Sequence, residues 1–235
     1  MNLILIFESD FISSHHVRIT DRRFFHAKEV LKVKLGQSLS VGRMNGLMGK
    51  GWVISLTDKA MELDVQLSQQ PPKSLPLILI LALPRPQMFK RTLLCAASLG
   101  IKKIIFLNFN RIEKSLWNSS VLGPEAIKEQ LVLGLEQAKD TILPEVILKK
   151  RFKPFVEDEL PLLIKNKKAC LAHPGEVHSL SKVGKEGVVL IIGPEGGLVD
   201  FEVDLLKSKG FQAVSLGERI LRFENVIPYA VGKMF

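Results

Sequence analysis

Cysteine is scarce in this sequence. The 235-residue chain contains two cysteines, Cys95 and Cys170, which lie far apart in apolar surroundings. Their separation fits neither a metal-ligand cluster nor a disulfide framework, and His15, His16 and His26 have no accompanying pattern of cysteine or carboxylate ligands. We therefore expect reduced, buried thiols and no metal centre.

Long hydrophobic runs are also absent. No apolar stretch reaches the ~18 residues that a membrane-spanning helix requires. The first residues, MNLILIFESD, form a short apolar run without a basic region before it or a small-residue cleavage site after it. They predict a strand rather than a signal peptide, and a soluble, cytoplasmic protein.

Acidic residues are fewer than basic ones. Lysine and arginine together number 33, and aspartate and glutamate 24, which gives a net charge of +9 and a pI near 9.6. This excess favours a polyanionic partner, most simply a nucleic acid, although a basic surface can also serve solubility alone. Apolar residues make up 46% of the chain, which is enough for a sizeable core and argues against wholesale disorder.

A proline-containing segment divides the sequence. Residues 69–74 (QQPPKS) predict a semi-rigid linker between domains at 1–70 and 74–235. The first domain has short alternating segments and one helix, at 24–34, a pattern typical of a small β-barrel. Its strands are expected near 39–43, 52–56 and 63–67.

The second domain alternates apolar strands with amphipathic helices. This rhythm predicts an α/β fold with a mostly parallel sheet that is covered on both faces. Strands are expected at 77–83, 104–107, 145–148, 169–172, 188–192 and 213–216, and helices before Gly100 and at 124–139, 155–165 and 201–209.

Three loops follow strands of the expected sheet, at 171–175, 193–197 and 215–219. In an open parallel sheet, ligands bind beyond the carboxyl ends of the strands. The GPEGG loop at 193–197 matches neither of the glycine-rich phosphate motifs, and Glu195 would repel a phosphate. A ligand recognised through main-chain groups, such as an adenine nucleoside with a sulfonium centre, fits this loop better. A purely structural turn is the alternative.

Five stretches together carry a resemblance to a known family. They are LIIGPEGG (190–197), GFQAVSLGERILRFEN (210–225), AASLGIKKIIFLNFNR (96–111), LEQAKDTILPEV (135–146) and HAKEVLKVKLGQ (26–37). With them the chain resembles the small-subunit ribosomal RNA methyltransferase E family, of the SPOUT class, over nearly its whole length.

The resemblance implies a fold and an activity. The fold would be a PUA-like β-barrel that binds RNA at 1–70 and a methyltransferase domain with a deep trefoil knot at 74–235. The enzyme would be a homodimer that uses S-adenosylmethionine to methylate N3 of a uridine in 16S ribosomal RNA. Its cofactor-binding residues would be Leu171, Ala172, His173, Ile192, Gly193, Pro194, Glu195, Gly196, Gly197, Leu216, Gly217, Ile220, Leu221 and Arg222.

Arg222 and Glu224, just past the last expected strand, are the candidate catalytic residues. Uracil N3 is a weak nucleophile until it loses its proton, so the site must favour the uracil anion. Arg222 can supply the fixed cation, because its guanidinium stays charged and offers two donors. Glu224 would orient Arg222 or accept the proton; alternatively, it only favours the first turn of the final helix. Glu195 either shapes its loop or faces the sulfonium. His173, which precedes Pro174, is either an exposed loop residue or a catalytic base, and Arg219 is either a solvated surface cation or part of the site.

Basic residues that could contact RNA occur in both domains. They are Arg18, Arg22, Arg23, Lys28, Arg85 and Arg111. Phe24 and Phe25 lie among the first four, and they either stack on bases or belong to the core. Arg85 and Arg111 follow strands and could touch the RNA backbone.

The chain departs from the family pattern on the nucleotide side. The family usually has Thr-Glu-Thr-Ala where this chain has Phe223-Glu224-Asn225-Val226. It often has Lys and Glu at the positions of Cys95 and Ser98, and Arg at that of Asp140, while Pro228 limits how the last helix begins. A paralogue that acts on another RNA site, or a non-catalytic RNA-binding protein that keeps the knot, is therefore the alternative.

Overall fold

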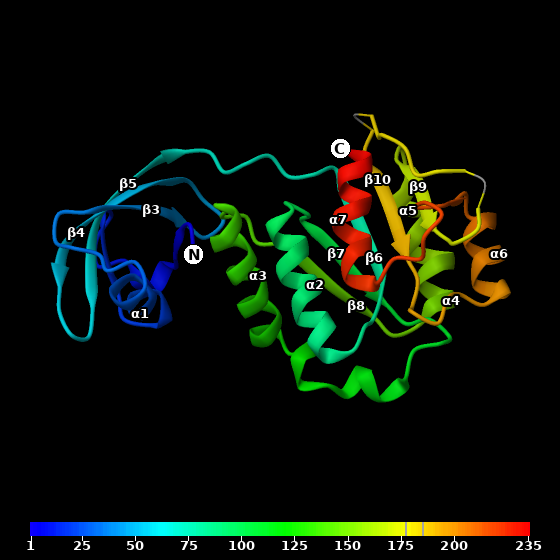
Figure 1. The fold of residues 1–235 in the computed structure, drawn as a ribbon, viewed down its shortest axis with the longest axis horizontal. Coiled ribbons are helices and arrows are strands. Elements are labelled where there is room, and N and C mark those ends of the chain that lie inside the picture. Colours follow the sequence, from blue (N-terminus) through cyan, green and yellow to red (C-terminus); the bar gives the residue numbers. More distant parts are fainter. Residues whose placement is uncertain (177, 185) are drawn as a thin grey trace. The chain divides into compact units, whose positions relative to one another are not determined.

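The structure is a computed structural model, and it describes residues 1–235 apart from Val177 and Lys185. The described residues form two compact units (Figure 1). The first comprises Met1–Lys73 and Val132–Leu143, and the second comprises Ser74–Leu131 and Pro144–Phe235. The first break in the chain lies within the proline-containing segment at 69–74. The return of a later segment to the first unit was not predicted.

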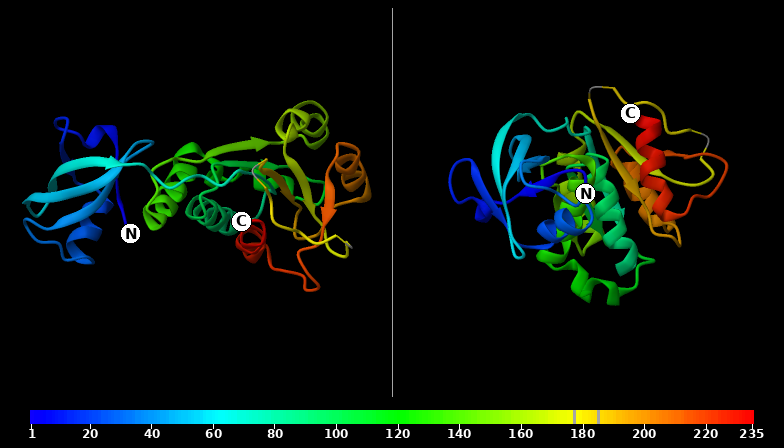
Figure 2. Two further views of the ribbon diagram at one scale, coloured as in Figure 1. Left: turned by 90° about the horizontal axis from the view of Figure 1, so that it is seen from above. Right: turned by 60° about the vertical axis from the view of Figure 1, so that its left-hand side comes forward.

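The first unit is built on a five-stranded sheet with the order β1-β3-β4-β5-β2. Its strands are β1 (Ile4–Ile6), β2 (His16–Ile19), β3 (Ser38–Arg43), β4 (Met48–Leu56) and β5 (Met61–Gln69). The pairs are antiparallel except β1 with β3, which run parallel. The sheet curls around a buried apolar cluster, a shape that fits a barrel (Figure 2).

The first unit also contains the helix α1 (Arg22–Glu29). It begins where the Asp21 carboxylate accepts a hydrogen bond from the main-chain N–H of Arg23 at 2.9 Å, which is an N-cap. It ends earlier than the predicted end at residue 34, and Lys32 adopts a left-handed φ of 50°. Phe24 is fully buried in the core, whereas Phe25 is 50% exposed. Phe24 is therefore a core residue, and only Phe25 has a face available for stacking.

The segment that returns from the second unit is hydrogen-bonded into the first. The carbonyl oxygen of Glu136 accepts hydrogen bonds from the N–H groups of Asn2 and Leu3, both at 3.0 Å. The N–H of Asn45 donates to the carbonyl oxygen of Thr141 at 2.8 Å, and Thr141 is fully buried. Because buried main-chain groups need such partners, this segment completes the first unit.

The second unit contains a six-stranded sheet with the order β11-β9-β10-β6-β7-β8. The strands are β6 (Leu77–Ala82), β7 (Lys103–Leu107), β8 (Glu145–Lys149), β9 (Lys168–Ala172), β10 (Val188–Ile192) and β11 (Gln212–Val214). Every pair is parallel, as predicted. The central strand β10 reads VVLII and all of its residues are buried, which is the pattern of a strand covered on both faces.

Helices cover this sheet. They are α2 (Pro86–Ser98), α4 (Phe152–Pro154), α5 (Leu160–Ile164), α6 (Asp200–Ser208) and α7 (Phe223–Met234), while α3 (Pro124–Ala138) begins in the second unit and ends in the first. The helices α2 and α7 pack against each other on one face, and α5 lies on the other (Figure 2). No helix in the described ranges has the length and apolar composition of a membrane span.

The carboxyl ends of β9, β10 and β11 lie next to one another. Ala172, at the end of β9, is the register partner of both Ile192 in β10 and Val214 in β11. Since the three strands run parallel, the loops that follow them start at one edge of the sheet. This edge is where the sequence predicted a ligand.

Candidate functional site

A cavity of about 850 Å³ opens where the three loops meet. Its volume lies within the ~300–1,000 Å³ that is usual for small-molecule sites. The residues that line it are 172–175, 192–195, 197–198, 215–224 and 226. We call this space the loop cavity.

Main-chain geometry gives the loop cavity its shape. The N–H of Gly197 donates to the carbonyl oxygen of Pro194 at 2.8 Å, which closes a tight turn, and Gly197 has a φ of +75°. Gly217 has a φ of +139°, a conformation that side chains other than hydrogen rarely allow. These glycines let the loops bend tightly around the cavity.

Several main-chain donors of the loops are not used internally. Within the described part of the chain, the N–H groups of Gly193, Glu195 and Leu216 donate to no other protein group. Main-chain N–H groups are strong donors that need a partner, which can be water or a ligand. The loop cavity can therefore recognise a ligand through its backbone.

The charged side chains of the loop cavity are mixed in sign. Five charged residues line it, and all of them are exposed: Glu195, Glu218, Glu224, Arg219 and Arg222. Among the residues that the structure describes, no lysine lines the cavity. The three carboxylates make the site unsuited to a polyphosphate and compatible with a ligand that carries a positive centre.

The sequence-predicted cofactor residues converge on this cavity. All of them line it except Leu171, which is buried inside β9, and Gly196, which lines a neighbouring cavity. Ile220 lines the loop cavity but is 88% exposed. The ring of His173 is directed to its own loop, with Nδ1 3.0 Å from the carbonyl oxygen of Pro174.

Both candidate catalytic residues also line the loop cavity. Arg222 occupies the N-cap position of α7, with extended backbone angles, and Glu224 lies in the first turn of the helix. In the part of the chain that the structure describes, neither side chain forms an ion pair. Both are therefore free to act on a ligand.

Phe223 and Val226 line the loop cavity as well, although they were not among the predicted site residues. Both lie on the inner side of the first turn of α7 and are 8% exposed. The sequence could have indicated them through their spacing, because residues three or four positions apart share one face of a helix.

A second, smaller cavity of about 220 Å³ lies on the other side of the GPEGG loop. It is lined by Ala82, Leu83, Pro84, Arg85, Arg111, Ile112, Glu113, Leu116, Pro194, Glu195, Gly196 and Phe223. Arg85 and Arg111, which were predicted to contact RNA, come together here. The Arg111 guanidinium donates a hydrogen bond to the carbonyl oxygen of Gly196.

Arg23 has a structural role instead of the predicted RNA contact. Its side chain is 2% exposed and forms ion pairs with Asp10 at 2.6 Å and Asp21 at 2.7 Å. Its guanidinium also donates to the carbonyl oxygen of Leu5 and lies 4.4 Å from the ring centroid of Phe7. Burial lowers the pKa of Arg23, but the bonds to the two carboxylates more than offset this and raise it. No donor of Arg23 is left for a phosphate.

The other basic residues of the first unit keep exposed side chains with acidic neighbours. Arg18 lies 3.8 Å from Glu62, and Lys28 forms an ion pair with Asp58 at 2.9 Å. Arg22 pairs with Glu136 at 2.8 Å and is 43% exposed. The Glu136 carboxylate is 1% exposed, unlike the acidic partners of Arg18 and Lys28. Exposed ion pairs contribute little to stability, so Arg18 and Lys28 can exchange their partners for a phosphate.

Asp140, which the sequence indicated as a departure on the nucleotide side, has a structural role. The residue is 3% exposed, and its carboxylate accepts a hydrogen bond from the N–H of Ile142 at 3.0 Å. It shapes the end of α3 and is not placed to repel an RNA.

The described residues contain no group of three or more His, Cys, Asp or Glu side chains that could hold a metal ion. The two thiols are unpaired. Burial raises the pKa of Cys95, and burial also raises that of Cys170, partly offset by Lys168. Neither thiol is therefore activated as a nucleophile.

Comparison with known proteins identifies relatives of the whole chain. Residues 71–234 match a family described as an RNA methyltransferase domain. The chain is 30% identical over 231 residues to ribosomal RNA small subunit methyltransferase E of Treponema pallidum, covering 96% of this chain and 87% of that protein. It is 26% identical over 232 residues to ribosomal RNA small subunit methyltransferase E 1 of Borreliella burgdorferi, covering 96% and 93%.

A solved structure shares the fold. Ribosomal RNA small subunit methyltransferase E from Neisseria gonorrhoeae, bound to S-adenosyl methionine, superposes with a TM-score of 0.75. The two proteins are 20% identical, and the match covers 98% of this chain and 95% of that one.

Proposed function

Because the chain belongs to the ribosomal RNA small subunit methyltransferase E family, we propose that it transfers a methyl group from S-adenosylmethionine to N3 of a uridine in 16S ribosomal RNA. The enzyme class and the cofactor follow from the family. The particular base atom is the one that the family methylates. The observation that carries the proposal is the convergence of three loops on one cavity with unused main-chain donors.

S-adenosylmethionine fits the loop cavity by size and by charge. Its nucleoside can be recognised by the free N–H groups of Gly193, Glu195 and Leu216. Its positive sulfonium is compatible with the carboxylates at the rim. When bound, it supplies an electrophilic methyl group.

We propose that Arg222 and Glu224 act on the target base. The Arg222 guanidinium stays charged at neutral pH, so it stabilises the negative charge that develops on uracil when N3 loses its proton. The Glu224 carboxylate either accepts that proton or orients Arg222. Both residues project from the start of α7 into the cavity that holds the methyl donor.

We also propose for this chain two more specific features of the family's fold. The second unit would be a SPOUT domain with a deep trefoil knot. Two contacts support this path: Ser215 exchanges hydrogen bonds with residues 178 and 180, and the N–H of Val183 donates to the carbonyl oxygen of Met234. The loop between β9 and β10 thus lies against two later parts of the chain. The first unit would be a PUA-like RNA-binding barrel.

We further propose a homodimer that works in the cytoplasm on the small ribosomal subunit. Support for the dimer comes from hydrophobic side chains exposed on α2, on α7 and at the residue that follows α7. Leu94 is 37%, Tyr229 41% and Phe235 42% exposed. Light scattering coupled to size-exclusion chromatography would give twice the chain mass for a dimer.

The activity can be tested with small subunits from cells that lack this chain. The purified protein should transfer labelled methyl groups to 16S ribosomal RNA and create one 3-methyluridine, mapped by mass spectrometry. Arg222→Ala should lower kcat by about 100-fold or more while calorimetry shows S-adenosylmethionine affinity within a few fold. Arg151→Ala, which removes an exposed arginine outside both cavities, is the matched control.

Two results would redirect the proposal. Methylation of a different RNA site would make this chain a paralogue with another target. Binding of RNA without S-adenosylmethionine binding would indicate a non-catalytic RNA-binding protein.

A further inference from the structure

The 220 Å³ cavity and the loop cavity share a wall. Pro194, Glu195 and Phe223 line both. A group that occupies the smaller cavity is therefore next to the loop cavity where it contacts these three residues. The smaller cavity lies below the usual size of a site for a whole cofactor, so it suits a single nucleobase or nucleotide.

The walls of the smaller cavity are held in place by buried hydrogen bonds. The Glu202 carboxylate, 2% exposed, accepts from the N–H of Asn110 at 2.7 Å and from the N–H of Val199 at 3.1 Å. The indole N–H of Trp117 donates to Asn108 Oδ1 at 2.8 Å. The loop after β7 is thus fixed to the loop after β10 before any ligand arrives. Such preorganisation lowers the entropic cost of binding.

Glu113 and Glu195 line this cavity together with Arg85 and Arg111, so a phosphate can be held only through a local contact with one of the arginines. Arg85 is exposed and precedes the first residue of α2, and its side chain makes no hydrogen bond or ion pair with the residues that the structure describes. Arg111 is already engaged with the carbonyl oxygen of Gly196. Arg85 is therefore the cation available for an incoming anion, and its planar donors match phosphate oxygens.

Phe223 supplies an aromatic surface at the shared wall. It is the first residue of α7, directly after Arg222, and is 8% exposed. Proteins that read single-stranded RNA hold unstacked bases against aromatic rings.

We infer that the smaller cavity receives the target nucleotide, with its base stacked on Phe223 and its phosphate held by Arg85. The inference rests on the proposed function. A base placed there presents its edge across the shared wall to the loop cavity, where Arg222 lies. Phe223 is then a substrate-binding residue.

The first experiment separates RNA recognition from cofactor binding. Phe223→Leu should raise KM for the RNA or lower kcat/KM by roughly 10- to 100-fold, the usual effect of losing one base–aromatic stack. Calorimetry should show S-adenosylmethionine affinity changed by no more than about threefold. Phe223→Tyr should restore most of the activity. Phe201→Leu, which alters a 55% exposed phenylalanine on α6, is the control.

Arg85→Ala changes only the smaller cavity. It should weaken RNA binding and reduce the slope of log affinity against log salt by about one charge, with unchanged S-adenosylmethionine binding. Arg91→Ala, an exposed arginine on the same helix that lines neither cavity, should leave the salt slope close to that of the wild type. The comparison of Arg85→Ala with Arg91→Ala tests the proposal even if a Phe223 variant does not fold.

A crosslink gives a readout that is independent of activity. RNA with 5-bromouridine at the methylated position should crosslink on irradiation to the peptide that contains Phe223. A crosslink elsewhere, or Phe223→Leu and Arg85→Ala enzymes with wild-type KM for RNA, would overturn the nucleotide cavity while leaving the methyltransferase assignment intact. A wild-type protein that methylates no RNA overturns both.

Discussion

Glu202 and Asn110 are 92 positions apart in the chain and are joined by a hydrogen bond of 2.7 Å from the Asn110 N–H to the Glu202 carboxylate. The second oxygen of the same carboxylate accepts from the N–H of Val199 at 3.1 Å. One buried side chain therefore connects the loop after β7 to the start of α6. The loop after β7 lines the smaller cavity, and the loop that leads to α6 supplies Pro194 and Glu195, which line both cavities.

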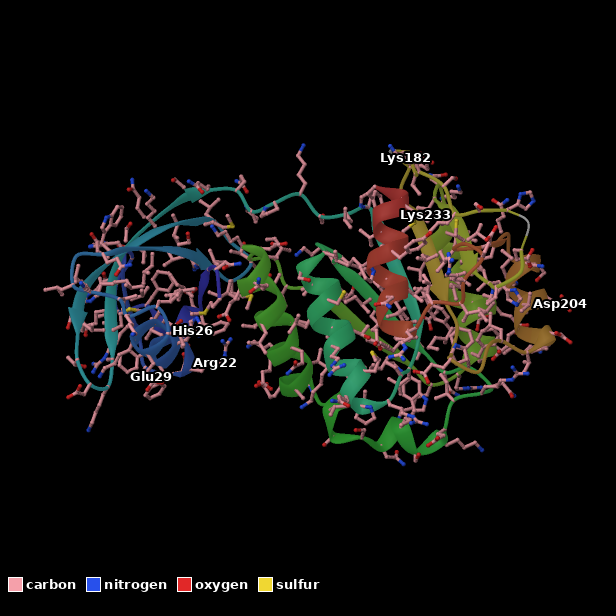
Figure 3. All side chains as sticks on the ribbon, viewed as in Figure 1. Arg22, His26, Glu29, Lys182, Asp204 and Lys233 are labelled. Carbon is pink, nitrogen blue, oxygen red and sulfur yellow. The ribbon has the colours of Figure 1, made fainter. Side chains whose placement is uncertain are left out.

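Glu202→Ala should destabilise the protein by about 2–4 kcal/mol, because it leaves two main-chain N–H groups without a partner. Urea unfolding followed by circular dichroism measures the loss. We also expect weaker S-adenosylmethionine binding, since the loop at 193–197 loses its support. Asp204→Ala is the matched control: Asp204 is exposed on the same helix (Figure 3) and should change stability by less than about 0.5 kcal/mol. Equal effects of the two variants would show that Glu202 does not connect the loops.

The ion pairs of Arg23 with Asp10 and Asp21 provide a second test of stability. Replacing Arg23 with leucine leaves the carboxylate of Asp10, 10% exposed, without its main cation. Removing one partner of a buried ion pair costs about 3–5 kcal/mol, so Arg23→Leu should unfold the first unit at much lower denaturant. Arg18→Leu, at an exposed position, should cost less than about 1 kcal/mol. If Arg23→Leu kept stability but lost RNA affinity, the residue would be an RNA contact after all.

The sheet of the second unit could be predicted because its strands are continuous apolar runs such as VVLII in β10, and because the loops after β9, β10 and β11 share one edge by register alone. The helix expected at 155–165 is less regular. Residues Phe155–Glu159 form a π-helix between α4 and α5, in a segment bounded by Pro154 and Pro161, which cannot donate the helical hydrogen bond.

Two features could not be predicted from local pattern. Arg23 looked like its basic neighbours, and only the tertiary structure brings Asp10, 13 positions away, to its guanidinium. The return of Val132–Leu143 to the first unit depends on pairing between Glu136 and residues 2 and 3. Such long-range contacts leave no periodic signal in the sequence.

The free energy of unfolding should depend on pH partly through the protonation of the Asp21 carboxyl group. Burial raises the pKa of this carboxyl, but hydrogen bonds and charge from Arg23 outweigh burial, so the pKa lies below the ordinary 3.8. A lowered pKa in the folded state adds stability that is present above the unfolded-state pKa and is lost as the pH falls through the folded-state pKa. Urea unfolding of the wild type should therefore show a decline below about pH 4.

Asp21→Asn should flatten part of that acid decline, because the amide does not titrate, and should lower stability at neutral pH. Asp58→Asn is a suitable control, since Asp58 is fully exposed beside Lys28 and exposed pairs contribute little. An unchanged acid profile in Asp21→Asn would mean that other carboxyl groups govern the decline.

Arg22 and Glu136 provide a test of why Val132–Leu143 belongs to the first unit. Arg22 extends from α1 (Figure 3) and donates to Glu136 Oε2 at 2.8 Å. The Glu136 side chain is 1% exposed, and its Oε1 has no hydrogen-bond partner among the described groups. Arg22→Met removes the cation and leaves a buried charge, which should cost about 2–4 kcal/mol because partial exposure of Arg22 screens the pair.

The double variant Arg22→Met with Glu136→Leu should recover most of that loss, since it also removes the buried Glu136 carboxylate that Arg22→Met alone leaves unpaired. A double-mutant cycle from urea unfolding would then give a coupling free energy of about 1–3 kcal/mol. Additive losses, with no recovery in the double variant, would show instead that the hydrogen bonds from Asn2 and Leu3 to the carbonyl oxygen of Glu136 hold the segment without help from its side chain.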